Sequence, residues 1–162
     1  MRVLIDEDTA VQLLQPLRHV LHKHQVEHIS TIGWKGKKDL RVLPDAKQAG
    51  HDVIITRDRN QLNDPAECDA IKRSGLHHVR YTQRREGLSG LALALGALIA
   101  VMPMVMEALE QADGQRLVYI IALDPGRRFE LTDPKRDPPR YPTARRCQAA
   151  AASRCCQAAV SS

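Results

Sequence analysis

Short hydrophobic runs alternate with longer segments of helical periodicity along the first half of the chain. The runs predict buried strands, and the segments between them predict helices because their apolar residues recur three and four positions apart. The predicted strands are Arg2–Ile5, Val26–Ser30, Asp52–Thr56 and His78–Tyr81. The predicted helices are Thr9–Lys23, with Asp8 or Thr9 as N-cap, Asp39–Gln48 and Pro65–Arg73. This alternation predicts right-handed crossovers and a mainly parallel sheet, which is an α/β fold.

The pattern changes in the second half. A long helix is predicted over residues 88–112, followed by strands at Leu117–Leu123 and Arg127–Leu131. The Asp-Pro-Gly sequence at 124–126 predicts a turn, so these strands should form a hairpin. Periodicity then ends, and we expect one domain over residues 1–132 and a disordered tail over 133–162.

Twenty residues of the long helix, Gly87–Met106, carry no charge, a length that suffices to span a bilayer. Pro103 and the acidic, amphipathic continuation after Met106 favour a buried helix of a soluble domain instead. Large residues at helical spacing (Leu91, Leu95, Leu98, Met102, Val105) should face the core. We expect the remaining apolar surface to support a homodimer, and we expect no membrane association.

Composition narrows the class of protein. The net charge is +5 and aromatic residues make up only 3% of the chain, which argues against a base-stacking surface. The excess positive charge lies in the tail, from Pro134 onward. The four cysteines form no CxxC pair that would suggest a zinc site or a disulfide framework. The chain opens directly with a strand and no signal sequence, so we expect a cytoplasmic protein.

Acidic residues gather where predicted strands end. Asp6, Glu7 and Asp8 follow the first strand, Asp58 and Asn60 follow the third, and Asp39 begins the helix that leads into the third. In a parallel sheet these positions share the carboxyl edge, where α/β proteins place their sites. Clustered carboxylates repel one another unless a hard cation such as Mg²⁺ or Mn²⁺ lies between them. The alternative is that Asp8 and Asp39 cap helices and Asp58 lies in a turn.

Three segments carry a resemblance to a known family. Val3–Asp8 (VLIDED), Gly36–Leu40 (GKKDL) with Ala46, and Asp52–Asn60 (DVIITRDRN) resemble the short PIN-like family, relatives of VapC-type toxin ribonucleases. The resemblance implies a three-layer α/β fold and a metal-dependent ribonuclease that cleaves RNA phosphodiesters. It implies catalytic and metal-binding roles for Asp6, Asp39 and Asp58. We expect Asp8 and Asn60 to be additional, second-rank metal ligands. Asn60 stands where the family usually has an acid.

Basic residues surround the predicted acidic site. We expect them to bind RNA, and they are Lys35, Lys37, Lys38, Arg41, Arg57 and Arg59. Expected partners are therefore an RNA substrate and, from the resemblance, a cognate antitoxin.

Two other interpretations stay open. A receiver domain has a similar arrangement of acids, but its chemistry needs a late lysine, and none occurs between Lys72 and Lys135. The second interpretation is a PIN-like domain that has no catalytic activity and binds RNA or a partner. The histidine pairs His22/His24 and His77/His78 are poorly spaced for a metal site, and we expect them at the surface.

Overall fold

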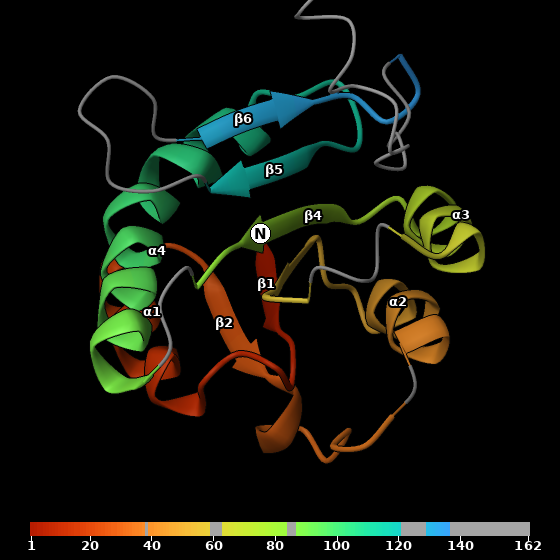
Figure 1. Cartoon of the computed structure of the whole chain (residues 1–162). Helices are drawn as coiled ribbons and strands as arrows, with labels where there is room; N and C mark the ends of the chain where they lie inside the picture. Colours follow the sequence, from red (N-terminus) through yellow and green to blue (C-terminus); the bar gives the residue numbers. More distant parts are fainter. Residues whose placement is uncertain (38, 59–62, 84–86, 121–128, 137–162) are drawn as a thin grey trace, which may run out of the picture.

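The computed structural model describes residues 1–37, 39–58, 63–83, 87–120 and 129–136, and within α2 it leaves the side chain of Asp39 undescribed. Six strands form one sheet in the order β2-β1-β3-β4-β5-β6 (Figure 1). The strands are β1 (Arg2–Ile5), β2 (Gln25–His28), β3 (Val53–Thr56), β4 (His77–Tyr81), β5 (Leu117–Ile120) and β6 (Phe129–Thr132). The first five are parallel, and β6 runs antiparallel to β5. The predicted mainly parallel sheet with a C-terminal antiparallel pair is confirmed. The turn predicted at 124–126 and the tail from 137 lie outside the described residues.

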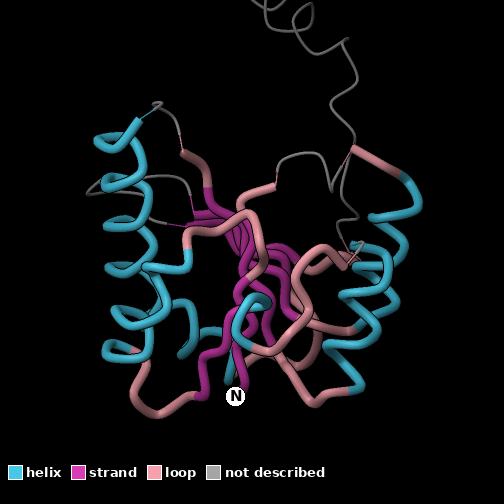
Figure 2. The backbone as a smooth tube through the Cα atoms, turned by 90° about the horizontal axis from the view of Figure 1, so that it is seen from below, coloured by secondary structure: helices cyan, strands magenta, loops and turns pink. Residues whose placement is uncertain are grey.

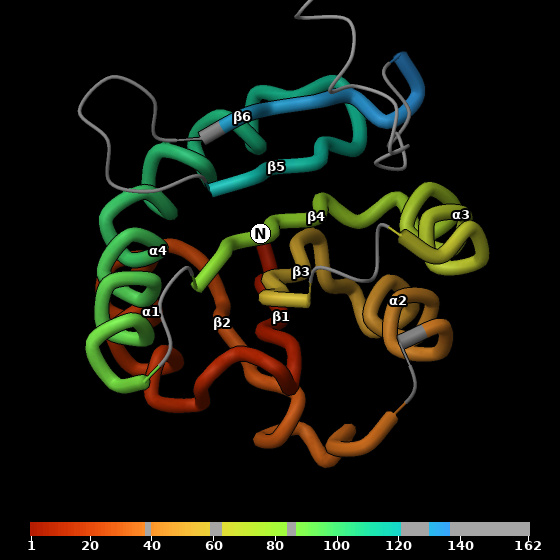
Figure 3. Tube along the Cα trace, viewed as in Figure 1, coloured from red at the N-terminus to blue at the C-terminus, as the bar shows by residue number. Residues whose placement is uncertain are grey.

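Helices cover both faces of this sheet, which makes three layers (Figure 2). The α-helices are α1 (Leu14–Val20), α2 (Asp39–Gln48), α3 (Pro65–Ser74) and α4 (Gly87–Glu110). Two 3₁₀ turns, η1 (Val11–Leu13) and η2 (Ile29–Thr31), complete the list. Helices α1 and α4 lie on one face, and α2 and α3 lie side by side on the other (Figure 3).

The strands supply both layers with apolar side chains. In β1, Val3 and Ile5 pack into the core beneath α1 and α4, whereas Leu4 packs beneath α2 and α3. The same alternation in β3 sends Ile55 to the first core and Ile54 to the second. Adjacent residues of a strand point to opposite faces, so a run of apolar residues is expected where both faces are covered.

The helix predicted over Thr9–Lys23 differs in its first turns. The chain enters through η1, preceded by Ala10, and no side chain caps it. The prediction that Asp8 or Thr9 caps this helix is therefore wrong, because the Asp8 carboxylate accepts hydrogen bonds from the Arg57 backbone and the Thr9 hydroxyl instead. By contrast, α3 begins with the predicted proline, is capped by Asp64 and ends at Gly75 with φ of 66°.

Helix α4 is long and apolar enough, by length and composition, to cross a membrane. In the structure it packs on the sheet against β4 and β5 and beside α1. Leu98, Met102 and Val105 are fully buried, whereas Leu91 and Leu95 are only partly buried. The predicted core-facing stripe is thus confirmed in its C-terminal part, whereas Leu88, Leu93 and Met104 of the same helix are exposed.

The second histidine pair is not at the surface as predicted. The side chain of His78 is only 1% exposed, and burial, with a smaller effect from Arg80, lowers its pKa to about 4. His77 is half-buried and accepts a hydrogen bond from the Arg116 backbone at 3.1 Å. Strand β4 lies between β3 and β5, and α2 and α3 cover the face of the sheet to which His78 points. The neighbouring strands and helices therefore bury this side chain.

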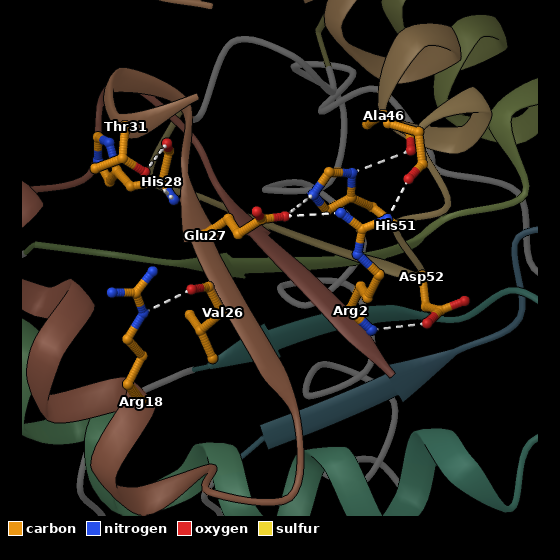
Figure 4. Close-up of polar contacts among 10 residues, drawn as sticks. Arg2, Arg18, Val26, Glu27, His28, Thr31, Ala46, His51 and Asp52 are labelled. Atoms are coloured by element: carbon orange, nitrogen blue, oxygen red, sulfur yellow. Dashed lines mark hydrogen bonds and ion pairs between the residues drawn. The ribbon is translucent and has the colours of Figure 1, made fainter. Parts of the chain in front are cut away.

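A polar network joins the strands at the amino edge of the sheet (Figure 4). The Glu27 carboxylate accepts hydrogen bonds from the Arg2 guanidinium at 3.0 Å and from the His51 ring at 2.9 Å. Arg2 also bonds to the Ala49 carbonyl after α2, and its backbone N–H donates to Asp52. This network fixes the C-terminal end of α2 at the amino edge, so α2 must begin near the carboxyl edge.

Candidate active site

The carboxyl ends of β1 and β3 meet at one edge of the sheet. These strands are hydrogen-bonded neighbours with Ile5 opposite Ile55. The first residue after β1, Asp6, continues the pairing, because its N–H donates to the Ile55 carbonyl at 2.9 Å. The parallel register therefore brings Asp6 beside Thr56, the last residue of β3.

The Thr56 hydroxyl connects the acids at this edge. It lies 3.0 Å from Asp6 Oδ2 and 3.4 Å from Asp8 Oδ2, and it accepts a hydrogen bond from the Asp58 backbone N–H at 3.1 Å. Thr56 is fully buried, and Asp6 is only 6% exposed. One hydroxyl proton can be donated to only one of the two carboxylates at a time. The structure thus brings Asp6 and Asp8 together around one side chain, with the backbone of Asp58 beside them.

The carboxylate of Asp8 is half-buried. Its Oδ1 atom accepts hydrogen bonds from the Arg57 backbone at 3.1 Å and from the Thr9 hydroxyl at 3.2 Å. Burial raises the pKa of Asp8, and the negative charge of Asp58 adds to this, although both hydrogen bonds and the Arg57 charge oppose the rise. A positive ion beside this carboxylate would favour its charged form.

Glu7 attaches a neighbouring loop to the site. Its carboxylate accepts a hydrogen bond from the Gly36 backbone at 2.6 Å. Gly36 has φ of 75°, a conformation that favours glycine, so the loop can turn back towards Glu7. The loop carries Lys35, which lines the cleft described next. Lys37 points elsewhere, because it lies 4.2 Å from the Trp34 ring centre and pairs with Asp45.

A cleft of about 810 Å³ opens over this edge. Carboxylates and two cations line it together with polar side chains and the apolar start of α4. Its lining residues are Glu7, Asp8, Thr9, Ala10, Val11, His28, Ser30, Lys35, Arg57, Gln83, Gly87, Leu88 and Leu91. The Arg57 guanidinium donates to the Gln83 side chain at 2.8 Å, which holds this cation at the cleft wall. A phosphate-bearing chain could contact Lys35 and Arg57 while it lies beside Asp8.

The remaining predicted residues are placed in different ways. Arg41 is exposed in the first turns of α2, and Asp58 is half-buried after β3. Lys38, Arg59 and Asn60 lie outside the described residues, and only the backbone of Asp39 is described, at the start of α2. Among the side chains described, no three His, Cys, Asp or Glu residues are close enough together to hold a metal ion. The site residues therefore stay predictions, with Asp6 and Asp8 shown to lie together.

Sequence reasoning missed Thr56 and Glu7 as site residues. Thr56 belongs to the Thr-Arg-Asp segment that was singled out, but a β-branched residue at a strand end is also what strand propensity favours. Its contact with Asp6 joins residues 50 positions apart, which no local pattern encodes. Glu7 stood in the acidic run after β1, and only the structure shows that it binds the loop at Gly36.

Strand order alone does not identify the family. The order 2-1-3-4-5 of the parallel strands also occurs in flavodoxin-like proteins, the arrangement of the receiver-domain alternative. The sequence model of the PIN-like domain family matches residues 1–83, which is half of the chain. The chain belongs to the PIN-like domain family. A search of curated proteins and a search of solved structures found no match.

The family assignment agrees with the acids that lie at the carboxyl edge of the sheet. PIN-like domains belong to a nuclease-type superfamily whose members usually use divalent metals, and some of them are inactive. The matched region contains β1 to β4 and all the acids of the candidate site. Helix α4 and strands β5 and β6 follow the matched region.

Proposed function

We propose that this PIN-like protein is a cytoplasmic ribonuclease that requires Mg²⁺ or Mn²⁺ and acts as the toxin of a toxin–antitoxin pair. The observation that carries the proposal is the convergence of Asp6 and Asp8 on the Thr56 hydroxyl, beside a cleft that also contains Lys35 and Arg57. Carboxylates that lie close together repel one another, and a bound metal ion relieves this repulsion. Lys35 and Arg57, which line the cleft, attract the phosphates of a polyanion such as RNA.

The donor set fits a hard divalent cation. It consists of oxygen atoms only, and a single hydroxyl proton faces two carboxylates, so one of them lacks that donor at any time. Asp6 and Asp8 would hold the ion, together with Asp39, Asp58 and Asn60 as the family resemblance implies. A bound divalent cation neutralises charge on the scissile phosphate and promotes attack by water.

The other residues have separate tasks in this proposal. Thr56 orients the Asp6 carboxylate from a fully buried position, so that its direction is fixed before substrate arrives. Arg57 and Lys35 bind phosphates of the RNA on either side of the scissile bond. Glu7 holds the loop that carries Lys35 at a constant distance from the acids.

A nuclease assay tests the activity. The purified chain is incubated with a fluorescent RNA in Mg²⁺, in Mn²⁺ and with a chelator, and Asp6→Asn is the inactive variant. Asp69→Asn, an exposed acid of α3, is the matched control. Metal-dependent cleavage that is lost in Asp6→Asn and kept in Asp69→Asn supports the proposal. Growth arrest on expression of the wild type, absent with Asp6→Asn, tests the toxin role.

A second candidate function is an inactive PIN-like domain that binds RNA or a partner protein. The sequence favours it at one position, because Asn60 stands where the family usually has an acid. This candidate predicts RNA binding without cleavage in either metal. Restoring the charge by Asn60→Asp would then produce activity that the wild type lacks.

A further inference from the structure

Thr9 directly follows the acids of the candidate site and is itself buried. It is only 1% exposed, and its backbone N–H donates to the Asp6 carbonyl at 3.1 Å, which closes a turn over residues 6–9. Its hydroxyl donates to Asp8 Oδ1 at 3.2 Å. A displacement of Thr9 would therefore move the Asp8 carboxylate with it.

The phenol of Tyr81 determines the direction of the Thr9 hydroxyl. Tyr81 ends β4, is fully buried and packs in the core beneath α1 and α4. Its hydroxyl donates to Thr9 Oγ1 at 3.3 Å, although the two residues are 72 positions apart. A hydroxyl that accepts this bond still has its own proton to donate, and the Asp8 carboxylate is the acceptor beside it. The Tyr81 and Thr9 hydroxyls thus form a relay that ends at Asp8 Oδ1.

His28, the last residue of β2, holds the backbone of Thr9. The Thr9 carbonyl can only accept, so the buried His28 ring carries a proton on Nε2, which lies 2.9 Å from that oxygen. Nδ1 accepts from the Ser30 N–H at 3.1 Å. The Thr31 hydroxyl bonds to both the N–H and the carbonyl of His28 and so fixes this strand end (Figure 4). His28 and Tyr81 therefore hold Thr9 from strands on opposite sides of β1.

The carboxylate at the end of the relay faces the cleft. Asp8 lines the cleft, and its Oδ1 also accepts a hydrogen bond from the Arg57 backbone at 3.1 Å. Buried polar groups need hydrogen-bond partners in any case, so a relay within the core can serve stability alone. This relay, however, ends on a half-buried carboxylate of the candidate site. The hydrogen-bond partners of a ligating carboxylate fix its direction and strengthen metal binding.

We propose that Tyr81 and His28 are positioning residues that hold the Asp8 carboxylate in a fixed direction through Thr9. Tyr81 acts on the Thr9 hydroxyl and His28 on the Thr9 carbonyl, so the two contacts together fix both the side chain and the backbone of Thr9. The benefit for metal binding rests on the proposed function, since it takes Asp8 as a ligand of the divalent cation. The fixed direction of the carboxylate is a property of the metal-free chain as well.

Mn²⁺ binding to the full chain tests the relay. Tyr81→Phe removes the phenol hydroxyl but keeps the packed ring, and Thr9→Val removes the threonine hydroxyl. Each should raise the dissociation constant of Mn²⁺ about 10-fold, the usual effect of losing a partner of a ligating carboxylate. Electron paramagnetic resonance of unbound Mn²⁺ measures these constants.

Tyr119→Phe is the matched control. It also removes a tyrosine hydroxyl that bonds to a threonine hydroxyl at the carboxyl edge, that of Thr82 at 3.0 Å. This variant should bind Mn²⁺ as tightly as the wild type. Equal affinities of Tyr81→Phe and Tyr119→Phe would overturn the relay.

A double variant shows whether Tyr81 acts through Thr9. In a chain that carries Thr9→Val, the further change Tyr81→Phe should not raise the dissociation constant again, because the relay is already broken. Additive effects, about 100-fold in total, would mean that Tyr81 reaches the site by another route, and the relay would be wrong.

Two substitutions of His28 separate its two hydrogen bonds. The amide nitrogen in His28→Gln lies near the position of Nε2 and can donate to the Thr9 carbonyl. The amide oxygen in His28→Asn lies near the position of Nδ1 and can accept from the Ser30 N–H. We expect Mn²⁺ affinity to be kept in His28→Gln and to fall about 10-fold in His28→Asn. The opposite order would show that His28 serves the turn at Ser30 and not the site.

Amide hydrogen exchange in the metal-free chain tests the positioning without the metal. The Arg57 N–H donates to Asp8 Oδ1, so its exchange rate reports how firmly the carboxylate is held. Tyr81→Phe and Thr9→Val should speed exchange at Arg57 on the order of 10-fold, and Tyr119→Phe should not change it. That result in a wild type that binds no Mn²⁺ would support the positioning role and overturn the proposed metal-dependent function. Unchanged exchange at Arg57 in Tyr81→Phe and Thr9→Val would overturn the positioning role even if the wild type binds Mn²⁺.

Discussion

Glu27 at the amino edge of the sheet and Asp8 at its carboxyl edge are both half-buried carboxylates next to an arginine. Glu27 accepts hydrogen bonds from the side chains of Arg2 and His51. Asp8 accepts its hydrogen bonds from the Arg57 backbone and from hydroxyl groups, while the Arg57 guanidinium bonds to Gln83. The two acids therefore have very different hydrogen-bond partners.

The pKa shifts of the two acids have opposite signs. Burial alone would raise the pKa of Glu27, but the hydrogen bonds and charges of Arg2 and His51 outweigh it, so the pKa is lowered. For Asp8 burial prevails, with the Asp58 charge adding to it, and the pKa is raised. A carboxylate with a lowered pKa stabilises the fold in its charged form, whereas one with a raised pKa is kept charged at a cost to stability. Acids whose pKa is raised by burial are found at many functional sites.

The largest expected effect is on catalysis at the carboxyl edge. Asp8→Asn should lower kcat/KM for RNA about 100-fold, because a neutral amide supports a divalent cation and its substrate less well. The thermal midpoint should stay equal or rise slightly, since the unfavourable charge is removed and the amide oxygen can still accept from Arg57 and Thr9. Steady-state kinetics and thermal unfolding measure the two effects. Full activity in Asp8→Asn would remove Asp8 from the site.

The matched change at the amino edge should act on stability alone. Glu27→Gln should lower the free energy of unfolding by about 1–3 kcal/mol, because the hydrogen bonds to Arg2 and His51 lose the charge of their acceptor. Activity per folded molecule should not change. Urea unfolding measures the loss, with Glu130→Gln on β6 as the control because that side chain is exposed. A loss of kcat at unchanged stability would show that the two edges do not differ as described.

As the pH falls, stability should decrease first because a buried histidine becomes protonated, and only at lower pH because the Glu27 network is lost. The pKa of His78 is about 4 in the folded state and 6.5 when exposed, so protonation favours unfolding. Stability should be complete above pH 6.5 and fall as the pH drops towards 4, by at most about 3 kcal/mol. The Glu27 contribution is lost only as the pH falls below its ordinary value of 4.5.

Urea unfolding between pH 7 and 4.5 checks this order. The His78→Gln variant removes the titrating group, so its stability should vary less over that range than that of the wild type. His24 and His77, whose pKa values burial also lowers, remain in the variant and account for the residual slope. An equal slope in both proteins would mean that His78 is protonated in the folded state without cost.

The smallest expected effect concerns the cations at the cleft. Lys35→Gln should raise KM for RNA about threefold and reduce the slope of log KM against log salt by about 0.7, as expected for the loss of one contact to a single-stranded phosphate. The value of kcat should stay constant because the acids are untouched. Lys72→Gln, an exposed lysine of α3, is the control. Equal KM values and salt slopes for Lys35→Gln and the wild type would place the RNA path elsewhere.

Much of the architecture could be predicted because it is encoded locally. Apolar runs predicted each strand to within a few residues, and Pro65 and Gly75 fixed the ends of α3. The positions of Asp6 and Asp58 after β1 and β3 predicted a shared edge, since parallel strands end together. The first turns of α1 and the burial of His78 were predicted wrongly, because a 3₁₀ entry and the cover of neighbouring layers leave no periodic signal.

The sequence by itself determined which residues form strands, which acids follow them and that one helix has an uncharged face. Only the tertiary structure decided that Thr56 joins Asp6 to Asp8, that Glu7 holds the loop of Lys35, and that the acids at the two edges differ in their partners. Periodicity and turn residues act over a few positions, whereas these contacts depend on strand register and layer packing between segments up to 50 positions apart. That dependence is physical, because a register shift of one residue would turn Thr56 to the other face of the sheet.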